Sequence, residues 1–222
     1  MKSFVRITSP EKLVKEYNTS YQKKFEFEKI KWSSKKSMEN RYKLLFSILP
    51  KKKFSNWIDI GSGTGTIFKY YQNIDYEINK IYGLEINKKL YDYSKEKKFK
   101  QKIFIENNDI INFKSKIKFD LITLIGVLQN CGHNPFKVLK KSSSFLKKNG
   151  LIFLTTKNIL YKDSFKKNSN KHSWFHPSEI VKELNKHSVK IKKIFGFNSH
   201  KNIVTPLDQS STFFILGKYE KK

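Results

Sequence analysis

The sequence predicts an α/β fold, in which a doubly wound, mostly parallel sheet of seven strands has helices on both faces and an N-terminal helical lid. Short apolar strand patterns alternate with helix patterns from 56 to 155. A glycine-rich turn follows the first of these strands. The first 50 residues are helical in pattern, so we expect a lid segment over 1–50 that precedes the main part of a single domain, 51–222.

Seven short apolar runs have the length and the flanking residues of strands. They lie at 56–60, 81–85, 102–106, 119–125, 151–155, 190–197 and 211–219. The first five alternate with helix patterns, which is typical of parallel strands joined by right-handed crossovers. We therefore expect helices against both faces of one sheet.

Helix boundaries are marked by capping residues and prolines. Ser9 is a candidate N-cap for a helix that begins at Pro10. Apolar residues recur at helical spacing over 37–49, and Pro50 ends that helix. Further helices are predicted at 66–72, after 85, at 135–146 and from Pro177, and the polar stretch 162–173 is predicted to be a mobile loop.

The chain of 222 residues carries 46 Lys and Arg against 19 Asp and Glu, a net charge of +27. Such a charge fits nucleic-acid binding. However, only Arg6 and Arg41 are arginines, and arginine is the residue preferred for bidentate phosphate and base contacts. We interpret the charge as mostly compositional, so nucleic acid is possible as a partner but not favoured.

Several classes of protein are disfavoured by what the sequence lacks. A single cysteine, Cys131, excludes an internal disulfide and a thiolate metal cluster within one chain. No spacing of His, Asp and Glu indicates a metal site, and no apolar run reaches the ~18 residues that a membrane span needs. The N-terminal residues do not resemble a signal peptide. We expect a cytoplasmic protein with no metal and no membrane partner, and no pattern indicates an oligomeric state.

The glycine-rich turn at 59–65 reads DIGSGTG. Gly61, Gly63 and Gly65 allow a tight turn and a close approach of a ligand to the backbone. The spacing differs from the G-x-G-x-x-G of dinucleotide binding, and no Gly-Lys-Ser/Thr of a P-loop follows. Glu85 ends the second strand 20 residues later, where its carboxylate can accept hydrogen bonds from ribose hydroxyls. A nucleoside-containing ligand is therefore expected, and an NAD-dependent dehydrogenase is disfavoured.

Five segments, in order and at similar spacings, resemble the motifs of the class I S-adenosylmethionine-dependent methyltransferases of the small-molecule type. They are 57–65 (WIDIGSGTG), 82–85 (YGLE), 108–110 (NDI), 119–128 (FDLITLIGVL) and 145–153 (FLKKNGLIF). The resemblance spans about 40–219. It implies a Rossmann-like sheet, S-adenosylmethionine as cofactor and S-adenosylhomocysteine as its product.

The resemblance also implies roles for the residues at the glycine turn and beside it. Gly61, Gly63 and Gly65 would lie under the methionine moiety and the ribose. Asp59 would orient the turn, and Glu85 would hold the ribose.

Four further cofactor contacts are implied by the resemblance. Asp109 would accept a hydrogen bond from the adenine amino group, and Ile110 would flank the ring. Ile125 would contact the methionine moiety. Arg41, 20 residues before Gly61, would bind the cofactor carboxylate, a task that suits a planar guanidinium.

Residues after the fourth strand are candidates to face a methyl acceptor, because ligands bind at the carboxyl ends of strands in such sheets. Gln129 and Asn130 can hydrogen-bond a polar acceptor. Similar small-molecule enzymes often carry Glu-His at these two positions. His133 is a candidate general base, with a loop or capping histidine as the alternative.

Aromatic residues and histidines elsewhere are further candidates. Trp174 and His176, with His172 nearby, would wall the acceptor pocket, His176 in a catalytic role. The alternative is a packed helix entry before Pro177. Trp32 would face the acceptor as part of the lid, or it would anchor the following helix on the sheet.

The sequence thus predicts a methyltransferase that moves a methyl group to a small polar acceptor by in-line displacement. We expect O-methylation of a sugar or a biosynthetic intermediate. A general base is needed only if the nucleophile is a hydroxyl or a protonated amine. The alternatives are an RNA or protein methyltransferase that uses the basic surface, and a non-catalytic S-adenosylmethionine-binding protein.

Overall fold

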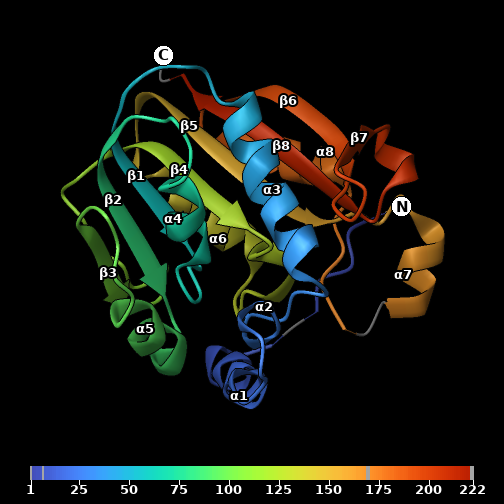
Figure 1. Ribbon diagram of the computed structural model, residues 1–222. Coiled ribbons are helices and arrows are strands. Elements are labelled where there is room, and N and C mark those ends of the chain that lie inside the picture. The colour runs from blue at the N-terminus through green and yellow to red at the C-terminus, as the bar shows by residue number, and fades with distance from the viewer. Residues whose placement is uncertain (1, 7, 169–170, 221–222) are drawn as a thin grey trace.

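Eight strands form one sheet in the computed structural model, which describes residues 2–6, 8–168 and 171–220 (Figure 1). They are β1 (Phe54–Ile60), β2 (Ile78–Glu85), β3 (Ile103–Asn107), β4 (Phe119–Ile125), β5 (Leu146–Lys157), β6 (Val189–Asn198), β7 (Ile203–Thr205) and β8 (Thr212–Tyr219). The order across the sheet is β3-β2-β1-β4-β5-β8-β6-β7. The pairs among β1 to β5 are parallel, whereas β8 runs antiparallel to both of its neighbours.

The described residues also form α-helices and two short 3₁₀ helices. The α-helices are α1 (Pro10–Tyr21), α2 (Glu26–Lys29), α3 (Lys35–Ile48), α4 (Thr66–Tyr71), α5 (Lys88–Lys95), α6 (Pro135–Ser143), α7 (Lys162–Asn168) and α8 (Pro177–Lys186). The 3₁₀ helices are Leu128–Asn130 and Leu207–Gln209. Within the described part of the chain, each helix is too short or too polar to cross a bilayer.

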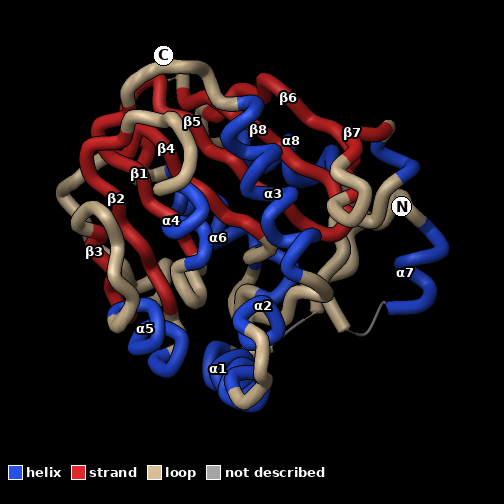
Figure 2. Tube along the Cα trace, in the orientation of Figure 1, coloured by secondary structure: helices blue, strands red, loops and turns tan. Residues whose placement is uncertain are grey.

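Helices cover both faces of the sheet, as the sequence predicts (Figures 1 and 2). One face packs against α3 and α4, and the other packs against α6 and α8. Successive residues of β4 show the reason: Leu121 joins the first cluster and Ile122 joins the second, and both are fully buried. A strand that is buried on both faces reads as a continuous apolar run, which is the pattern of 119–125.

Two elements differ from the prediction. The sheet has an eighth strand, β7, which lies at the edge with Ile203 and Val204 exposed and is too short to show a periodicity. The polar stretch 162–173, predicted as a loop, contains α7. Phe165 of this helix packs edge-on against Phe4 and Trp174, so a distant aromatic contact holds a segment whose local composition is polar.

The N-terminal segment divides into two parts. Helices α1 and α2 lie beyond the carboxyl ends of β1 and β2, where a lid is predicted (Figure 1). Ser9 caps α1 as expected, with its hydroxyl accepting from the Lys12 amide at 3.2 Å. Helix α3 instead packs on the sheet, where its Leu45 is fully buried. The lid position is therefore held by residues before about 35.

Candidate active site

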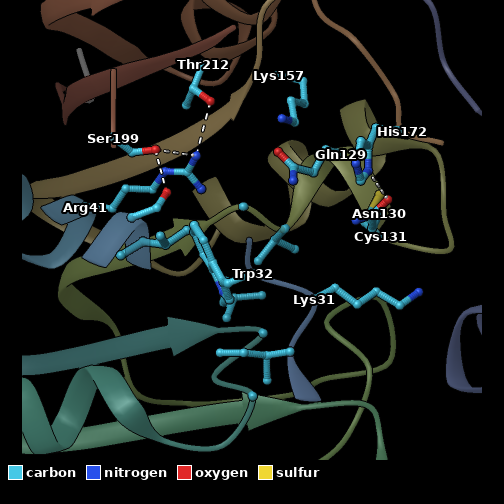
Figure 3. Close-up of a pocket in the computed structure, with 18 of the residues that line it drawn as sticks. Lys31, Trp32, Arg41, Gln129, Asn130, Cys131, Lys157, His172, Ser199 and Thr212 are labelled. Carbon is cyan, nitrogen blue, oxygen red and sulfur yellow. Dashed lines mark hydrogen bonds between the residues drawn. The ribbon is translucent and has the colours of Figure 1, made fainter. Parts of the chain in front are cut away.

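A cavity of about 350 Å³ lies at the carboxyl ends of the parallel strands (Figure 3), and Leu13 and Tyr17 of α1 form part of its wall. The order of strands reverses between β1 and β4, and this switch point is where α/β sheets bind ligands. The cavity brings together eleven of the residues that the sequence predicts: Trp32, Arg41, Asp59, Gly61, Gly63, Glu85, Asp109, Ile110, Ile125, Gln129 and Asn130.

The glycine turn forms the floor of the cavity. Gly61 and Gly63 adopt φ values of +72° and +56°, which favour glycine. A Cβ on Gly61 would lie 2.7 Å from Val127 Cγ2, and one on Gly63 would lie 2.9 Å from Ile30 Cγ2. The backbone is therefore open to a ligand only because no side chain stands there. Gly65 precedes α4 and lies outside the cavity wall.

Glu85 is joined to the glycine turn by a hydrogen bond. Its Oε2 accepts from the Gly63 amide at 2.8 Å, and its Oε1 accepts from the Asn87 amide at 2.8 Å. Burial raises the pKa of this carboxyl, while the backbone amides oppose that rise. Since each oxygen accepts one protein hydrogen bond, each has capacity for another from a ligand hydroxyl.

Asp59 lies at the end of β1 and is also buried. The Thr123 hydroxyl donates to Asp59 Oδ1 at 2.5 Å, and the Trp57 indole donates to the same hydroxyl at 2.9 Å. Burial raises the pKa of Asp59 to about 7. The hydrogen bonds fix the carboxyl at the edge of the cavity, so that a cationic ligand group beside it would favour the ionised form.

Asp109 is engaged by two groups of the protein. Its Oδ1 accepts from the Ile111 amide at 2.9 Å, and its Oδ2 is paired with His133 Nε2. His133 itself does not line the cavity. The structure therefore pairs this histidine with Asp109 outside the cavity wall, whereas a general base would need to face the acceptor.

Two other predicted residues lie away from the cavity. His176 is the N-cap of α8, where its Nδ1 accepts from the Ser178 amide at 3.3 Å. Trp174 is fully buried and packs against Phe165. Both positions match the alternative of a packed helix entry, because neither side chain reaches the cavity wall.

Arg41 reaches the cavity from α3 and is buried, with 6% of its surface exposed. Its guanidinium donates to Ser199 Oγ at 3.3 Å and to Thr212 Oγ1 at 3.2 Å, and it stacks 4.3 Å from the centre of the Trp32 ring. The buried Nε has no hydrogen-bond partner among the described residues. Burial lowers the pKa of Arg41 to about 9. The guanidinium of Arg41 is thus surrounded by two neutral hydroxyls and an aromatic ring.

Lys157 and His172 also line the cavity (Figure 3). Lys157 ends β5, and burial together with the charge of Arg41 lowers its pKa to about 8. His172 Nδ1 lies 3.1 Å from Asn130 Oδ1, and burial lowers the pKa of its imidazole to about 4. Lys157 is not among the residues that the sequence predicts, although its place at the end of a parallel strand is a signal that could have found it.

Among the described residues, no three His, Cys, Asp or Glu side chains lie close enough to hold a metal ion. The remaining cavity wall contains hydroxyls and aromatic rings from distant parts of the chain. Ser199 follows β6 and Thr212 begins β8, and neither lies in a motif that sequence reasoning could identify.

The cavity at the switch point combines a glycine turn with the carboxylate of Glu85 at the end of β2. This combination is typical of α/β proteins that bind a nucleoside-containing ligand. The family described as "Methyltransferase domain" matches residues 33–190. The chain belongs to this methyltransferase family. A search of the curated proteins finds no significant match.

Solved structures of methyltransferases share the fold. The N-methyltransferase NodS of Bradyrhizobium japonicum, solved with S-adenosylhomocysteine, is similar with a TM-score of 0.68 and 11% identity over 94% of this chain and 99% of that one. An S-adenosylmethionine-dependent methyltransferase of Clostridium acetobutylicum has a TM-score of 0.69 and 13% identity, over 93% of this chain and 99% of that one. A chain from a Haloferax volcanii complex between the Trm112 methyltransferase activator and a methyltransferase has a TM-score of 0.67 and 12% identity, over 84% of this chain and 93% of that one.

Proposed function

We propose that this protein transfers the methyl group of S-adenosylmethionine to an oxygen of a small polar acceptor. One observation carries the proposal. One half of the cavity contains the glycine turn and three carboxylates. The other half is polar and is lined by residues that follow β4 and β5. A methyltransferase needs these two compartments side by side, because the donor and the acceptor must meet in line.

The residues of the first half fit S-adenosylmethionine. This cofactor has a sulfonium, an ammonium and one carboxylate, and Asp59, Glu85 and Asp109 line the half that would hold its cationic and hydroxyl groups. Any side chain at Gly61 or Gly63 would fill the cradle. The similarity of fold to NodS, which was solved with S-adenosylhomocysteine, supports the same assignment.

Other wall residues complete the proposed cofactor site. Ile110 would flank the adenine, and Ile125 would contact the methionine moiety. Arg41 would pair with the single carboxylate, for which its unpartnered Nε is a free donor.

When bound, S-adenosylmethionine supplies an electrophilic methyl group on a sulfonium that leaves readily. The protein therefore acts mainly by alignment and by exclusion of water. Leu13 and Tyr17 of α1, with Ile30 and Trp32 after α2, line the side of the cavity toward the lid. Gln129 and Asn130 offer amide groups that would hold the acceptor.

His172 is the best-placed proton acceptor for a hydroxyl nucleophile. With Asn130 Oδ1 accepting from Nδ1, the unprotonated Nε2 is available to a ligand. The pKa of about 4 keeps the ring neutral at pH 7, so Nε2 can accept a hydrogen bond from the acceptor hydroxyl and orient it, while the same low value makes the ring a weak base. We assign to His172 the role that the sequence predicts for His133 and His176.

The alternative of an RNA or protein substrate is weaker. Exposed lysines occur on α3, as Lys36 and Lys43, and on α6, as Lys137 and Lys140, and these two helices pack on opposite faces of the sheet. This distribution does not gather the charge on one face, and a cavity beneath a lid suits a small acceptor. The polar second half of the cavity counts against a non-catalytic binder.

Calorimetric titration with S-adenosylmethionine and S-adenosylhomocysteine, with NAD as control, tests the cofactor assignment. Micromolar binding of both sulfur ligands without NAD binding is expected. Transfer of a labelled methyl group to a panel of small hydroxylated compounds then tests the acceptor class, with His172→Gln as the matched variant. Absence of binding would contradict the cofactor assignment, and transfer to RNA alone would favour the alternative.

A further inference from the structure

Charge is divided across the cavity. The carboxylates Asp59, Glu85 and Asp109 lie on the half formed by β1 and β2 and the loop after β3. The opposite half, formed by β5, the start of β8 and the loop after β6, presents Arg41 and Lys157 (Figure 3). A division of this kind selects ligand groups of opposite sign for each half.

The ammonium of Lys157 lacks an acidic neighbour among the described residues. It lies 5.4 Å from the centre of the Trp174 ring, and the charged group that affects it most is the like charge of Arg41. Gln129 and His172 share the same part of the wall. Lys157 is half-buried, and removing an unpaired cation even partly from water costs free energy, so an anion from outside the protein would stabilise its ammonium.

The buried Arg41 and the half-buried Lys157 outnumber the anions that the cofactor can supply. S-adenosylmethionine has one carboxylate, which Arg41 would bind in the proposed function. Lys157 then remains without a counterion. A single ammonium suits a monoanion, whereas a phosphate monoester, with close to two charges at pH 7, would need a second cation.

We propose, on the basis of the proposed function, that the methyl acceptor carries a carboxylate and that Lys157 binds it. The acceptor is then a small hydroxylated acid, held by its carboxylate at the end of β5 while its hydroxyl faces His172. Lys157 is a specificity-determining residue and takes no part in the transfer of the methyl group.

Matched acids and amides test this proposal. The rise in unfolding temperature is measured with acetate against acetamide and with benzoate against benzamide, at constant ionic strength. Each titration is done with and without S-adenosylhomocysteine, in the wild type, in Lys157→Met and in Lys137→Met. Lys137 is an exposed lysine of α6, so its replacement removes the same charge far from the cavity.

The wild type and Lys137→Met are expected to prefer the acids, with at least roughly tenfold lower half-saturating concentrations than for the amides. Lys157→Met is expected to lose this preference. It should unfold at a higher temperature than the wild type without ligand, because it no longer buries an unpaired charge. Stabilisation by S-adenosylhomocysteine should be equal in all three proteins.

Equal responses to acid and amide in the wild type would overturn the proposal, as would a preference that survives in Lys157→Met. Inorganic phosphate is a separate arm, and a stronger response to phosphate than to either acid would replace the carboxylate with a phosphate group. Failure of S-adenosylhomocysteine to stabilise any of the proteins would refute the proposed function instead. The comparison of acid with amide remains decisive in that case, because it is also made without the cofactor product.

Discussion

Asp59 lies beside the glycine turn with a pKa raised to about 7, in a site proposed to hold a cation. The folded protein binds this proton more tightly than the unfolded chain, in which an aspartate has a pKa near 4. The contribution of Asp59 to stability is therefore complete below about pH 4. It is lost as the pH rises through about 7. A cationic ligand reverses this preference, since it favours the carboxylate.

The substitution Asp59→Asn should flatten the dependence of stability on pH. Between about pH 4 and pH 7 the wild type should lose up to ~1.4 kcal/mol of unfolding free energy per pH unit from this group, and the variant should not. Urea denaturation at pH 5, 6, 7 and 8 measures the difference. Parallel curves for the two proteins would contradict the assignment. The pH dependence that remains in Asp59→Asn reports the other buried groups, Glu85 among them.

The substitution Glu85→Gln should weaken binding of S-adenosylhomocysteine by roughly tenfold or more. A glutamine can place only one oxygen where Gly63 and Asn87 now donate to two, so one amide would face an NH₂ group. Calorimetric titration measures the loss. Glu96→Gln, at an exposed carboxyl after α5, is the control and should bind like the wild type. Equal affinities in the two variants would remove Glu85 from the cofactor site.

Single residues show how far the sequence can locate a site. Asp59, Gly61, Gly63 and Glu85 stand at strand ends in a known pattern, and the structure brings them to one cavity. His133 has the chemistry of a base but faces Asp109, because the loop after β4 turns its ring behind the carboxylate. The composition of a loop reveals which side chains are available, but not which way they point.

Among the elements, α1 and α2, which lie where the lid is predicted, are held by few buried contacts. Leu13 is the only buried residue of α1, and α2 has none. Ion pairs from Glu16 to Arg6 at 2.6 Å and to Lys31 at 2.8 Å contribute little where the side chains are partly exposed. An element with so little buried surface opens at low free-energy cost.

Hydrogen exchange should therefore be faster in α1 and α2 than in β1 and β4, and S-adenosylhomocysteine should slow it in the lid. The protection is expected because Leu13, Tyr17 and Ile30 line the cavity that the ligand would fill. Mass spectrometry of peptides across 8–34 measures it, with peptides of α8 as the internal control. Exchange in the lid that is as slow as in β4, or unaffected by the ligand, would contradict a lid role.

Helices and strands were predicted correctly where burial produces a periodic pattern of apolar residues in the sequence. They were missed where a contact between distant residues determines the structure. The apolar run of β4 and the capped start of α1 are local signals. The edge strand β7 has only three residues, and α7 is held by Phe165 against Phe4 and Trp174. Such contacts join residues more than 150 positions apart in the case of Phe4 and Phe165, which no local window includes.

At the scale of the whole molecule, the charge of +27 opposes the compact state. Screening by salt weakens repulsion between exposed charges that lie more than about 10 Å apart at 0.1 M ionic strength. The unfolding temperature should therefore rise as sodium chloride increases from low to moderate concentration. Potassium chloride should give the same rise, because screening depends on ionic strength. A fall in unfolding temperature would indicate that attractive ion pairs outweigh the repulsion.

The fold class and the meeting of the glycine turn with Asp59 and Glu85 in one cavity were predictable, because a parallel sheet places its strand ends at one edge. In the other half, Gln129 and Asn130 were predicted from their place after β4, whereas Ser199, Thr212 and Lys157 were not. Ser199 and Thr212 come from the β6–β8 region, and only the antiparallel insertion of β8 between β5 and β6 brings them beside Arg41. That order of strands cannot be read from the order of motifs along the chain.

The position of β8 has a consequence for biosynthesis. The strand β8 separates β5 from β6, so β6 has no place in the sheet until residues 212–219 have left the ribosome. The segments for β1 to β5, with the glycine turn and Glu85, emerge earlier, and in the sheet these five strands pair with one another without β6 to β8. During translation the half of the cavity proposed for the cofactor can therefore form first, and the half proposed for the acceptor is completed only after β8 has emerged.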